Sequence, residues 1–418
     1  MYSTIEVFLN GKWAPAAEFQ PAGRYKATFA YLPEYVFGGQ AVPVALNYPI
    51  DMEWSGVDAE TGAPDCPAFL LDLVPQGRGR KLLVEELKIA DGEDSDLLLV
   101  QYGAFNAVGN LRIDTAVEFY EKWQARNPNS GIAGFRFKDI ISRKEEFLEH
   151  IWMHAMYAAG TTGVQGAAPK FLLTQNQDDL WFADAALLDT EAAKHWLVKL
   201  PRGTHETDYA VLRNEAAYLR VAERCGLRTG GEPIHEGGML FVPRFDRIVS
   251  NTGLHRLPQE TLASLAGSRG FGIPVSLFKL VDSFRSHVSN PVEEIAEFIK
   301  RDILNLALRN TDNHARNTSV QRLPDGTIQL TPVYDFAPMY LDQEMIVRGC
   351  RWSTPEIHEV SDLSDIVGLI NVSEIQKQEV VNSLRDFSGV LQNIEGIMEE
   401  CGVDKAVIEY CKPYIDAQ

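Results

Sequence analysis

The stretch LRNTDNHARNTSV, at positions 308–320, places several kinds of polar side chain directly after a segment with helical periodicity. Asp312, His314 and Asn317 follow one another in the order D-x-H-x-x-N. A carboxylate here could orient a reacting hydroxyl group, and an amide oxygen five residues later could bind Mg²⁺, which prefers oxygen ligands. Asn, Asp and Thr also cluster in ordinary polar turns, because their side chains hydrogen-bond locally. The stretch alone therefore predicts either a turn or a catalytic loop.

A second candidate metal ligand, Asp335, follows Asn317 by eighteen residues in the segment TPVYDFAP. Protein kinases space their motifs in a similar way. An Asp orients the substrate hydroxyl, an Asn five residues on holds magnesium, and a D-F-G Asp completes the metal site. We expect Asp335 to end an apolar strand, with a hairpin around LPDG (323–326) returning it towards Asp312. One carboxylate and one amide, together with phosphates, suffice for Mg²⁺. The two motifs together predict phosphoryl transfer.

Transfer from ATP also requires groups that hold the phosphates, and these are sought in the first half of the chain. The segment GTTGVQGAAPK (160–170) could present backbone N–H groups to phosphate, although a flexible connector would look the same. Lys199 in LVKLP is predicted in the middle of a strand, where a lysine is costly to bury unless it is paired. Glu215 is either its partner or one acid on a solvated helix face. FVPRFDR (241–247) is predicted to be a hinge.

The elements that would position these groups form two blocks. Short strands with few helices precede about residue 245, and helices dominate afterwards. This predicts an α+β, bilobal, protein-kinase-like fold with a β-rich N-terminal lobe and a mainly helical C-terminal lobe, divided as 1–110, 111–245 and 246–418. Extended segments are expected at STIEVFLNG, YKATFAYLP and PVALNYPI. Helices are expected at 137–157, 208–225, 258–266, 275–286, 291–309, 373–400 and 403–413.

Composition excludes several classes of protein. The net charge of −19 argues against non-specific binding to nucleic acid or to anionic membranes. No apolar run approaches the length of a spanning helix, and the first residues lack the features of a signal peptide. The five cysteines form no C-x-x-C pair, so a reduced, cytoplasmic protein is expected. His150 and His154 lie at helical spacing, but the H-E-x-x-H order of zinc proteases is absent.

In this order, the motifs resemble those of the HipA family of bacterial toxin serine/threonine kinases, and the resemblance covers most of the chain. It implies a kinase-related fold and transfer of the γ-phosphate of ATP, with Mg²⁺, to a serine or threonine of a protein. The matching segments are FLLDLVPQGRGRKLL, LLVQYGAFNAVGNLRI, VQGAAPKFLL, LVKLPRG, FVPRFDR, RLPQET, NTDNHARN and YDFAP.

The resemblance also assigns roles by position. Asp312 would be the catalytic Asp with His314 beside it, and Asn317 and Asp335 would bind the metal. Lys199 would hold the α- and β-phosphates. The remaining nucleotide contacts would come from Gly166, Ala167, Ala168, Lys170, Val242, Pro243, Phe245 and Gln259.

The chain departs from the family pattern at three places. The serine that precedes the family's glycine-rich loop and can be autophosphorylated is replaced by Gly163, with Thr161 and Thr162 as hypothetical substitutes. Ala168 replaces a usual Gln. Pro243 stands where the hinge often has Glu, and it keeps a carbonyl that could accept from an adenine amino group.

Family members commonly pair with a small helix-turn-helix antitoxin that binds DNA, and their known targets are aminoacyl-tRNA synthetases. The resemblance therefore implies a protein substrate, an antitoxin partner and contact with DNA only through that partner. Two alternatives stay open. Lipid and inositol kinases also use D-x-H-x-x-N, so the acceptor could be a lipid or small-molecule hydroxyl. The chain could also be a non-catalytic, nucleotide-binding subunit of a toxin–antitoxin complex.

Overall fold

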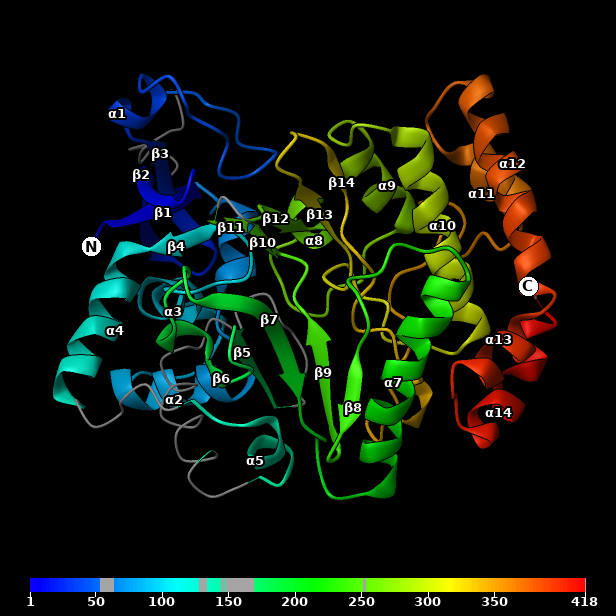
Figure 1. Ribbon diagram of the computed structural model, residues 1–418. Coiled ribbons are helices and arrows are strands. Elements are labelled where there is room, and N and C mark those ends of the chain that lie inside the picture. The colour runs from blue at the N-terminus through cyan, green and yellow to red at the C-terminus, as the bar shows by residue number, and fades with distance from the viewer. Residues whose placement is uncertain (53–63, 128–133, 144–146, 148–168, 251–252, 418) are drawn as a thin grey trace. The chain divides into compact units, whose positions relative to one another are not determined.

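The structure is a computed structural model that describes residues 1–52, 64–127, 134–143, 147, 169–250 and 253–417 (Figure 1). The chain divides into two compact units. Unit 1 consists of Met1–Lys199 and Asp246–Glu260, and unit 2 of Leu200–Phe245 and Thr261–Gln418. Each unit is therefore built from two separate pieces of the sequence.

Unit 1 begins with an antiparallel sheet of strand order β3-β2-β1-β4. The turn between β1 and β2 is Asn10–Gly11, and both residues have positive φ, as a two-residue hairpin turn requires. Ile5 and Val7 of β1 point into the core. The elements of this part are β1 (Ser3–Leu9), β2 (Lys12–Gly23), β3 (Lys26–Tyr31), α1 (Pro33–Val36), η1 (Ala68–Leu73), α2 (Gly77–Leu87), η2 (Glu93–Ser95), α3 (Asp96–Gly103), β4 (Leu111–Ile113) and α4 (Asp114–Arg126).

The second part of unit 1 has a sheet in which β5 lies between β6 and β7. The β5–β6 turn is held by the Asn176 side chain, whose Oδ1 accepts from the backbone N–H groups of Asp178 (3.0 Å) and Leu180 (2.9 Å). The strands β10 and β11 form a separate hairpin. The elements are α5 (Phe137–Ile141), β5 (Lys170–Asn176), β6 (Trp181–Ala183), η3 (Asp184–Ala186), β7 (Ala192–Lys199), β10 (Arg247–Ser250), β11 (Gly253–Arg256) and β12 (Gln259–Thr261).

Unit 2 starts with the long helix α7 (Glu206–Arg224) and the hairpin of β8 (Ile234–Glu236) and β9 (Met239–Pro243). Leu212 and Ala216 of α7 form a buried cluster with Leu240 of β9, and Val242 packs against it. The strand β9 ends at Pro243, as expected for a residue without a backbone N–H to donate to a ladder.

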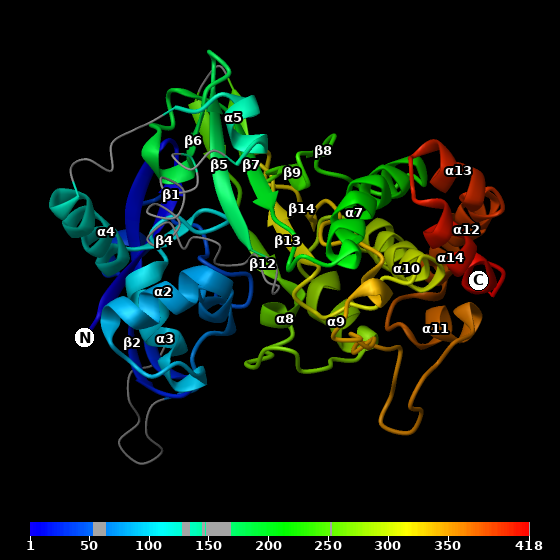
Figure 2. The same ribbon diagram turned by 90° about the horizontal axis from the view of Figure 1, so that it is seen from below.

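The rest of unit 2 is mainly helical, and its central helix is α10 (Pro291–Ala307). Asn290 caps α10 by accepting from the Glu293 N–H, and Pro291 occupies the first turn, where its missing N–H costs nothing. The helix α12 lies alongside α10 (Figure 1 and Figure 2). The other elements are α8 (Leu262–Leu265), α9 (Leu277–Arg285), β13 (Ser319–Arg322), β14 (Ile328–Leu330), η4 (Met339–Leu341), α11 (Leu363–Leu369), α12 (Glu374–Leu391), α13 (Ile394–Glu400) and α14 (Lys405–Ile415).

The α+β class is confirmed, whereas several predicted elements are wrong. PVALNYPI contains only an isolated bridge between Ala45 and Tyr48, because its two prolines remove ladder donors. The segment 331–335 is not a strand: the hairpin around LPDG joins β13 to β14. Helix 258–266 shrinks to α8 after β12, helix 373–400 divides into α12 and α13, and α11 was not predicted.

Helix 137–157 is described only as α5, and most of its remainder lies outside the described residues. Within the part of the chain that the structure covers, no helix has the length and apolar character needed to cross a membrane.

Candidate active site

The catalytic loop predicted from the sequence begins where α10 ends. Tyr218 of α7 is fully buried, and its hydroxyl donates to the Leu308 carbonyl at 2.9 Å. Burial raises the pKa of Tyr218 well above its usual value, so the hydroxyl keeps the proton that it donates. Arg309 then takes a left-handed conformation (φ +57°), which ends the helix. The end of α10, where the predicted catalytic loop begins, is therefore held in a defined position.

Side-chain hydrogen bonds hold the loop in shape. The Asn317 Nδ2 donates to the Asp312 carbonyl at 2.8 Å, which closes the six-residue segment on itself. The Asn313 Oδ1 accepts from the backbone N–H groups of Gly349 (3.1 Å) and Cys350 (3.2 Å), while its Nδ2 donates to the Cys350 carbonyl at 2.7 Å. The polar turn that the sequence offered as an alternative is thus present, and the candidate catalytic side chains belong to it.

Asp312 and His314 face each other across the loop. The His314 Nε2 lies 3.5 Å from an Asp312 carboxylate oxygen, and the Arg316 backbone N–H donates to the His314 Nδ1 at 3.3 Å. Because Nδ1 accepts this bond, the proton of a neutral His314 sits on Nε2, the nitrogen nearer Asp312. The Asp312 side chain is 25% exposed and the His314 side chain 28% exposed, so both can be reached from outside the protein.

Asp335 is presented by an irregular segment instead of the predicted strand. Its backbone is left-handed (φ +51°), which Asp tolerates better than most residues. The Asn310 Nδ2 lies 3.4 Å from the Asp335 carbonyl and 2.9 Å from the Asn305 Oδ1. Phe336 is buried, with its ring 5.2 Å from that of Tyr218. The backbone of Asp335 and the residue that follows it are therefore fixed.

A pocket in unit 2 collects these side chains. It encloses about 620 Å³ of empty space, including the part open to solvent, and its lining includes Asp312, His314, Asn317 and Asp335. All four candidates that the sequence placed after residue 300 thus meet in one place. Seven further polar residues line the pocket and were not among the predicted site residues: Arg301, Asp302, Asn305, Asn310, Asn313, Thr318 and Tyr334. Asn310, Asn313 and Thr318 fall inside the polar stretch 308–320 and Tyr334 inside TPVYDFAP, whereas Arg301, Asp302 and Asn305 carried no visible signal.

The pocket suits a magnesium ion bound together with phosphates. The Asn317 Nδ2 is held by the Asp312 carbonyl, which leaves Oδ1 as the ligand atom, and the Asp335 carboxylate lines the same pocket. No group of three or more His, Cys, Asp or Glu side chains among the described residues is arranged to hold a metal. A divalent cation here would therefore bind the Asp335 carboxylate, the Asn317 amide oxygen and phosphate oxygens, as Mg²⁺ with a nucleotide does.

Buried ion pairs support the pocket wall. Arg301 donates to Glu297 with Nη2 at 2.7 Å and to the Thr331 carbonyl at 2.7 Å, and the Arg228 N–H donates to Glu297 at 3.0 Å. Burial would raise the pKa of Glu297, but the charges and hydrogen bonds of Arg301 and Arg228 outweigh it and hold that pKa below its usual value. Glu297 is therefore ionised at neutral pH.

Lys199, in unit 1, is buried with 4% exposure and is the last residue of β7, not a mid-strand residue as predicted. It lies directly opposite Lys170 of β5 in the strand register. Glu215, in unit 2, is 3% exposed, which rules out the solvated helix face.

The other nucleotide-binding candidates are distributed over both units. Gln259 begins β12 in unit 1, and its buried Oε1 has no hydrogen-bond partner among the described residues. In unit 2, Val242 and Pro243 end β9, and the Phe245 ring lies 6.0 Å from that of Tyr334, which lines the pocket. The candidates that lie outside the described residues are Gly166, Ala167, Ala168, Thr161, Thr162 and Gly163.

Two family models match the chain. Residues 5–114 match the family model of the HipA N-terminal domain, and residues 162–393 match that of the HipA-like C-terminal domain. The chain is 25% identical over 345 residues to the serine/threonine-protein kinase toxin HipA of Shewanella oneidensis, covering 74% of each protein.

Among solved structures, the chain resembles a complex of HipA, HipB and operator DNA from Shewanella oneidensis. The TM-score is 0.67 at 19% identity, covering 99% of this chain and 96% of the other. The kinase CtkA of Helicobacter pylori gives a TM-score of 0.34 at 13% identity, covering 53% of this chain and 86% of the other. Since the C-terminal domain model alone spans more than half of the sequence, the chain belongs to the HipA family.

Proposed function

We propose that this protein is a serine/threonine protein kinase that transfers the γ-phosphate of ATP, with Mg²⁺, to a protein hydroxyl and acts as a growth-arresting toxin. The observation that carries the proposal is the pocket of unit 2, where Asp335 meets the side chains of Asp312, His314 and Asn317 from a loop fixed by its own hydrogen bonds. The homology to a HipA toxin kinase supports the same activity.

Each side chain in the pocket has a distinct task in this proposal. Asp312 orients the acceptor hydroxyl and receives its proton. His314 lies beside the Asp312 carboxylate and helps to orient it. Asn317 and Asp335 would hold Mg²⁺, which when bound neutralises charge on the phosphates. Because this type of transfer depends mainly on positioning and electrostatics, a rigid loop serves it well.

The nucleotide is proposed to bind through residues of both sequence halves. Lys170 and Lys199, opposed at one end of the β5–β7 pair, would contact phosphate oxygens. Gln259 would approach the triphosphate with its buried amide, and the segment 242–245 would face the adenine. Residues 166–168 lie outside the described residues, and their proposed contact with the phosphates rests on the sequence alone.

The partners are proposed from the relatives. The related solved structure is titled a complex of HipA with HipB and operator DNA. We propose a small helix-turn-helix antitoxin as partner, contact with DNA only through it, an aminoacyl-tRNA synthetase as the class of protein substrate, and action in the cytoplasm. The net charge of −19 supports this route to DNA, because a strongly negative chain is repelled by the DNA phosphates.

An Asp312→Asn substitution tests the proposal. Asn keeps the size of the side chain but cannot accept the hydroxyl proton, so transfer should fall by about 10³-fold or more while ATP binding and folding persist. Radiolabel transfer from ATP is measured with protein, lipid and small-molecule acceptors, and phosphosites are mapped in cells that express either form. Asp386→Asn, an exposed residue of α12, is the matched control.

The results separate the alternatives. Loss of protein phosphorylation in Asp312→Asn, with normal phosphorylation in Asp386→Asn, supports the proposal. Transfer at the wild-type rate would refute the role of Asp312. Labelling of a lipid or small molecule instead of protein would change the acceptor, and growth arrest that persists in Asp312→Asn would favour a non-catalytic subunit.

A further inference from the structure

A short buried loop joins the two sheets of unit 1. It runs from Ala104 to Asn110, between α3 and β4, and we call it the joining loop. Ala104, Asn106, Ala107 and Asn110 are all less than 8% exposed. Loops normally lie at the surface, because their backbone polar groups need partners. A buried loop must therefore find those partners in the protein.

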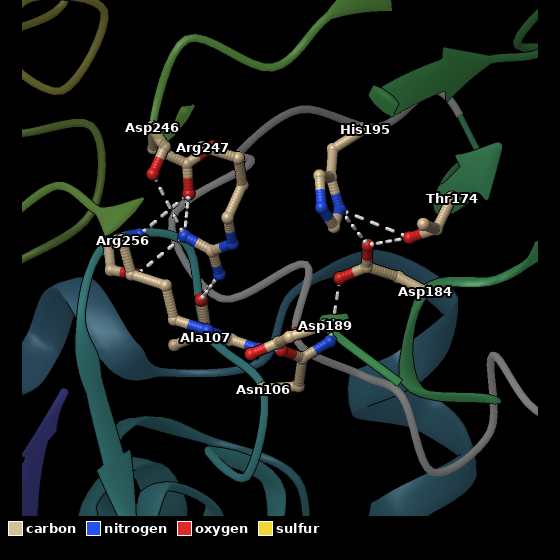
Figure 3. Close-up of polar contacts among 10 residues, drawn as sticks. Asn106, Ala107, Thr174, Asp184, Asp189, His195, Asp246, Arg247 and Arg256 are labelled. Atoms are coloured by element: carbon tan, nitrogen blue, oxygen red, sulfur yellow. Dashed lines mark hydrogen bonds and ion pairs between the residues drawn. The ribbon is translucent and has the colours of Figure 1, made fainter. Parts of the chain in front are cut away.

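The first set of partners lies around Asp184, which follows β6. The Asn106 Nδ2 donates to one carboxylate oxygen of Asp184 at 2.7 Å. The other oxygen accepts from the Thr174 hydroxyl of β5 at 2.6 Å and lies 2.9 Å from the His195 Nδ1 of β7 (Figure 3). One buried carboxylate thus links the joining loop to both β5 and β7.

The second set of partners lies at the start of β10. The Gly109 N–H donates to the Asp246 carboxylate at 2.9 Å, and Arg247 donates to the Gly109 carbonyl at 2.7 Å. Arg247 also donates to the Ala107 carbonyl at 3.0 Å (Figure 3). Arg247 also pairs with Asp246 at 2.6 Å, and its side chain is fully buried. The N–H and the carbonyl of Gly109 are therefore both hydrogen-bonded to charged side chains.

The Arg256 side chain of β11 closes the network. It donates to the Asn106 Oδ1 at 3.0 Å and pairs with Asp189 at 2.9 Å (Figure 3). Both polar ends of the Asn106 amide are thus engaged, its nitrogen by Asp184 and its oxygen by Arg256. Charge-assisted hydrogen bonds in a buried environment are strong and directional, so this network fixes the joining loop tightly.

The joining loop also passes beside a candidate nucleotide-binding residue. A Cβ built on Gly109 (φ +93°) would lie 3.5 Å from the Gln259 backbone nitrogen and 3.7 Å from the Gln259 Cβ. Gln259 keeps an unpartnered, buried Oε1 among the described residues. A methyl group at position 109 would therefore lie in van der Waals contact with Gln259.

We infer that the joining loop positions the phosphate-binding residues of the kinase, so that the N-terminal part of the chain sets the affinity for ATP. The loop lies beside Gln259 at Gly109. It also fixes β7 through Asp184 and His195, four residues or about 13 Å along the strand from Lys199. The inference rests on the proposed function, because it assigns these residues to ATP.

The location of the loop makes this more than local packing. The joining loop falls within the match to the HipA N-terminal domain (5–114). Its partners Thr174, Asp184, His195, Asp246 and Arg247 fall within the match to the HipA-like C-terminal domain (162–393). A change in the first region can thus alter the nucleotide affinity of the second without touching the nucleotide.

Two variants of the network test the inference in the full-length chain. Arg247→Lys keeps the charge but cannot reach both carbonyls in the fixed geometry of a guanidinium. Gly109→Ala pushes a methyl group towards Gln259. The controls are Arg24→Ala, which removes an exposed pair with Glu93, and Gly11→Ala, which places alanine at a similar positive φ (+78°) with nothing within 4 Å.

The measurements are the dissociation constant for Mg·ATP by calorimetry, the KM for ATP and kcat for phosphorylation, and the melting temperature. The KM and dissociation constant should rise about tenfold in both network variants, with kcat within about twofold of wild type and both controls unchanged. A purely structural role would instead lower the active fraction, which reduces kcat and leaves the KM as it was.

The outcomes are distinct. Network variants that match their controls in KM and dissociation constant overturn the inference while the proposed function stands. A wild type that binds no Mg·ATP overturns both. If Arg247→Lys does not fold, the comparison of Gly109→Ala with Gly11→Ala decides, since both glycines have the same backbone requirement.

Discussion

Asn317 shows how one small side chain can serve both the backbone and a ligand. Its nitrogen donates to the Asp312 carbonyl, so its oxygen is held at a fixed orientation towards the pocket. An Asp at the same position would lose this donor bond, and a Gln would extend the oxygen by a further carbon. The D-x-x-x-x-N spacing is therefore a consequence of a loop that closes on itself.

Asp335→Ala tests the second proposed metal ligand. Without this carboxylate, nucleotide binding should lose most of its dependence on magnesium, because one amide oxygen is a weak ligand for a hard cation. The affinity for ATP is measured at increasing Mg²⁺ in the wild type, in Asp335→Ala and in the exposed control Asp386→Ala. An unchanged magnesium titration in Asp335→Ala would contradict the assignment.

At the residue scale, the sequence indicated which residue types are present for chemistry more clearly than it indicated their backbone conformation and contacts. The types and spacing of Asp312, Asn317 and Asp335 were visible because chemistry restricts which residues can serve. The left-handed backbone of Asp335 and the contact of Asn313 with Gly349 and Cys350 were not visible. Both depend on segments far away in the chain, which no local spacing encodes.

At the scale of elements, α10 anchors the pocket through charged side chains on its buried face. Arg228, in the loop after α7, pairs with Glu294 at 2.9 Å and donates to the Leu330 carbonyl at 2.8 Å. The Leu330 N–H in turn donates to Glu294 at 2.8 Å. With Glu297 and Arg301, this network fixes β14, and through it the segment leading to Asp335, against the helix.

Glu297→Gln tests this network by its pH dependence. The pKa of Glu297 is lowered in the folded protein, so its stabilising effect is complete above the ordinary value near 4.5 and is lost as the pH falls through the folded pKa. The wild type should therefore lose unfolding free energy faster than Glu297→Gln as the pH falls below about 4.5. At pH 7 the variant should be about 3 kcal/mol less stable, because Arg301 loses its buried partner.

The measurement is urea denaturation at pH values from 7 down to 3. Glu374→Gln, which removes an exposed pair with Lys377, is the control and should follow the wild type. Parallel curves for Glu297→Gln and the wild type over the acid range would show that Glu297 does not titrate with folding.

Two long helices were predicted accurately for a physical reason. The predicted helix 291–309 is α10, and the predicted helix 208–225 is α7, because caps and periodic apolar residues are local signals. The segments PVALNYPI and TPVYD have strand-like composition, yet they form no regular ladder. A strand exists only where another segment supplies the pairing, and composition does not report that partner.

At the scale of the whole molecule, neither unit is continuous in sequence. The piece Asp246–Glu260 belongs with the first 199 residues, and the Gly109–Asp246 hydrogen bond and the Arg247 contacts are among the bonds that hold it there. A division into consecutive stretches of sequence cannot represent a segment that leaves unit 2 and rejoins unit 1. The predicted scheme of 1–110, 111–245 and 246–418 stays a prediction.

The overall charge gives a prediction about DNA. With a net charge of −19, the purified chain should not bind duplex DNA at about 0.15 M salt, because binding requires cations that replace the counterions of the phosphates. A gel-shift titration with operator-like and random duplexes measures this. Retardation that weakens as salt rises would reveal a basic surface that the composition hides.

The burial of Phe336 beside Tyr218 has a consequence for small-molecule inhibitors. A compound that enters by displacing the Phe336 ring must expose a side chain that is now 3% accessible, at a cost of about 1.5–3 kcal/mol before it gains any contact. It must also separate the ring from Tyr218, whose hydroxyl secures the end of α10. Inhibitors of this protein should therefore be sought among compounds that fill the existing pocket beside Asp335.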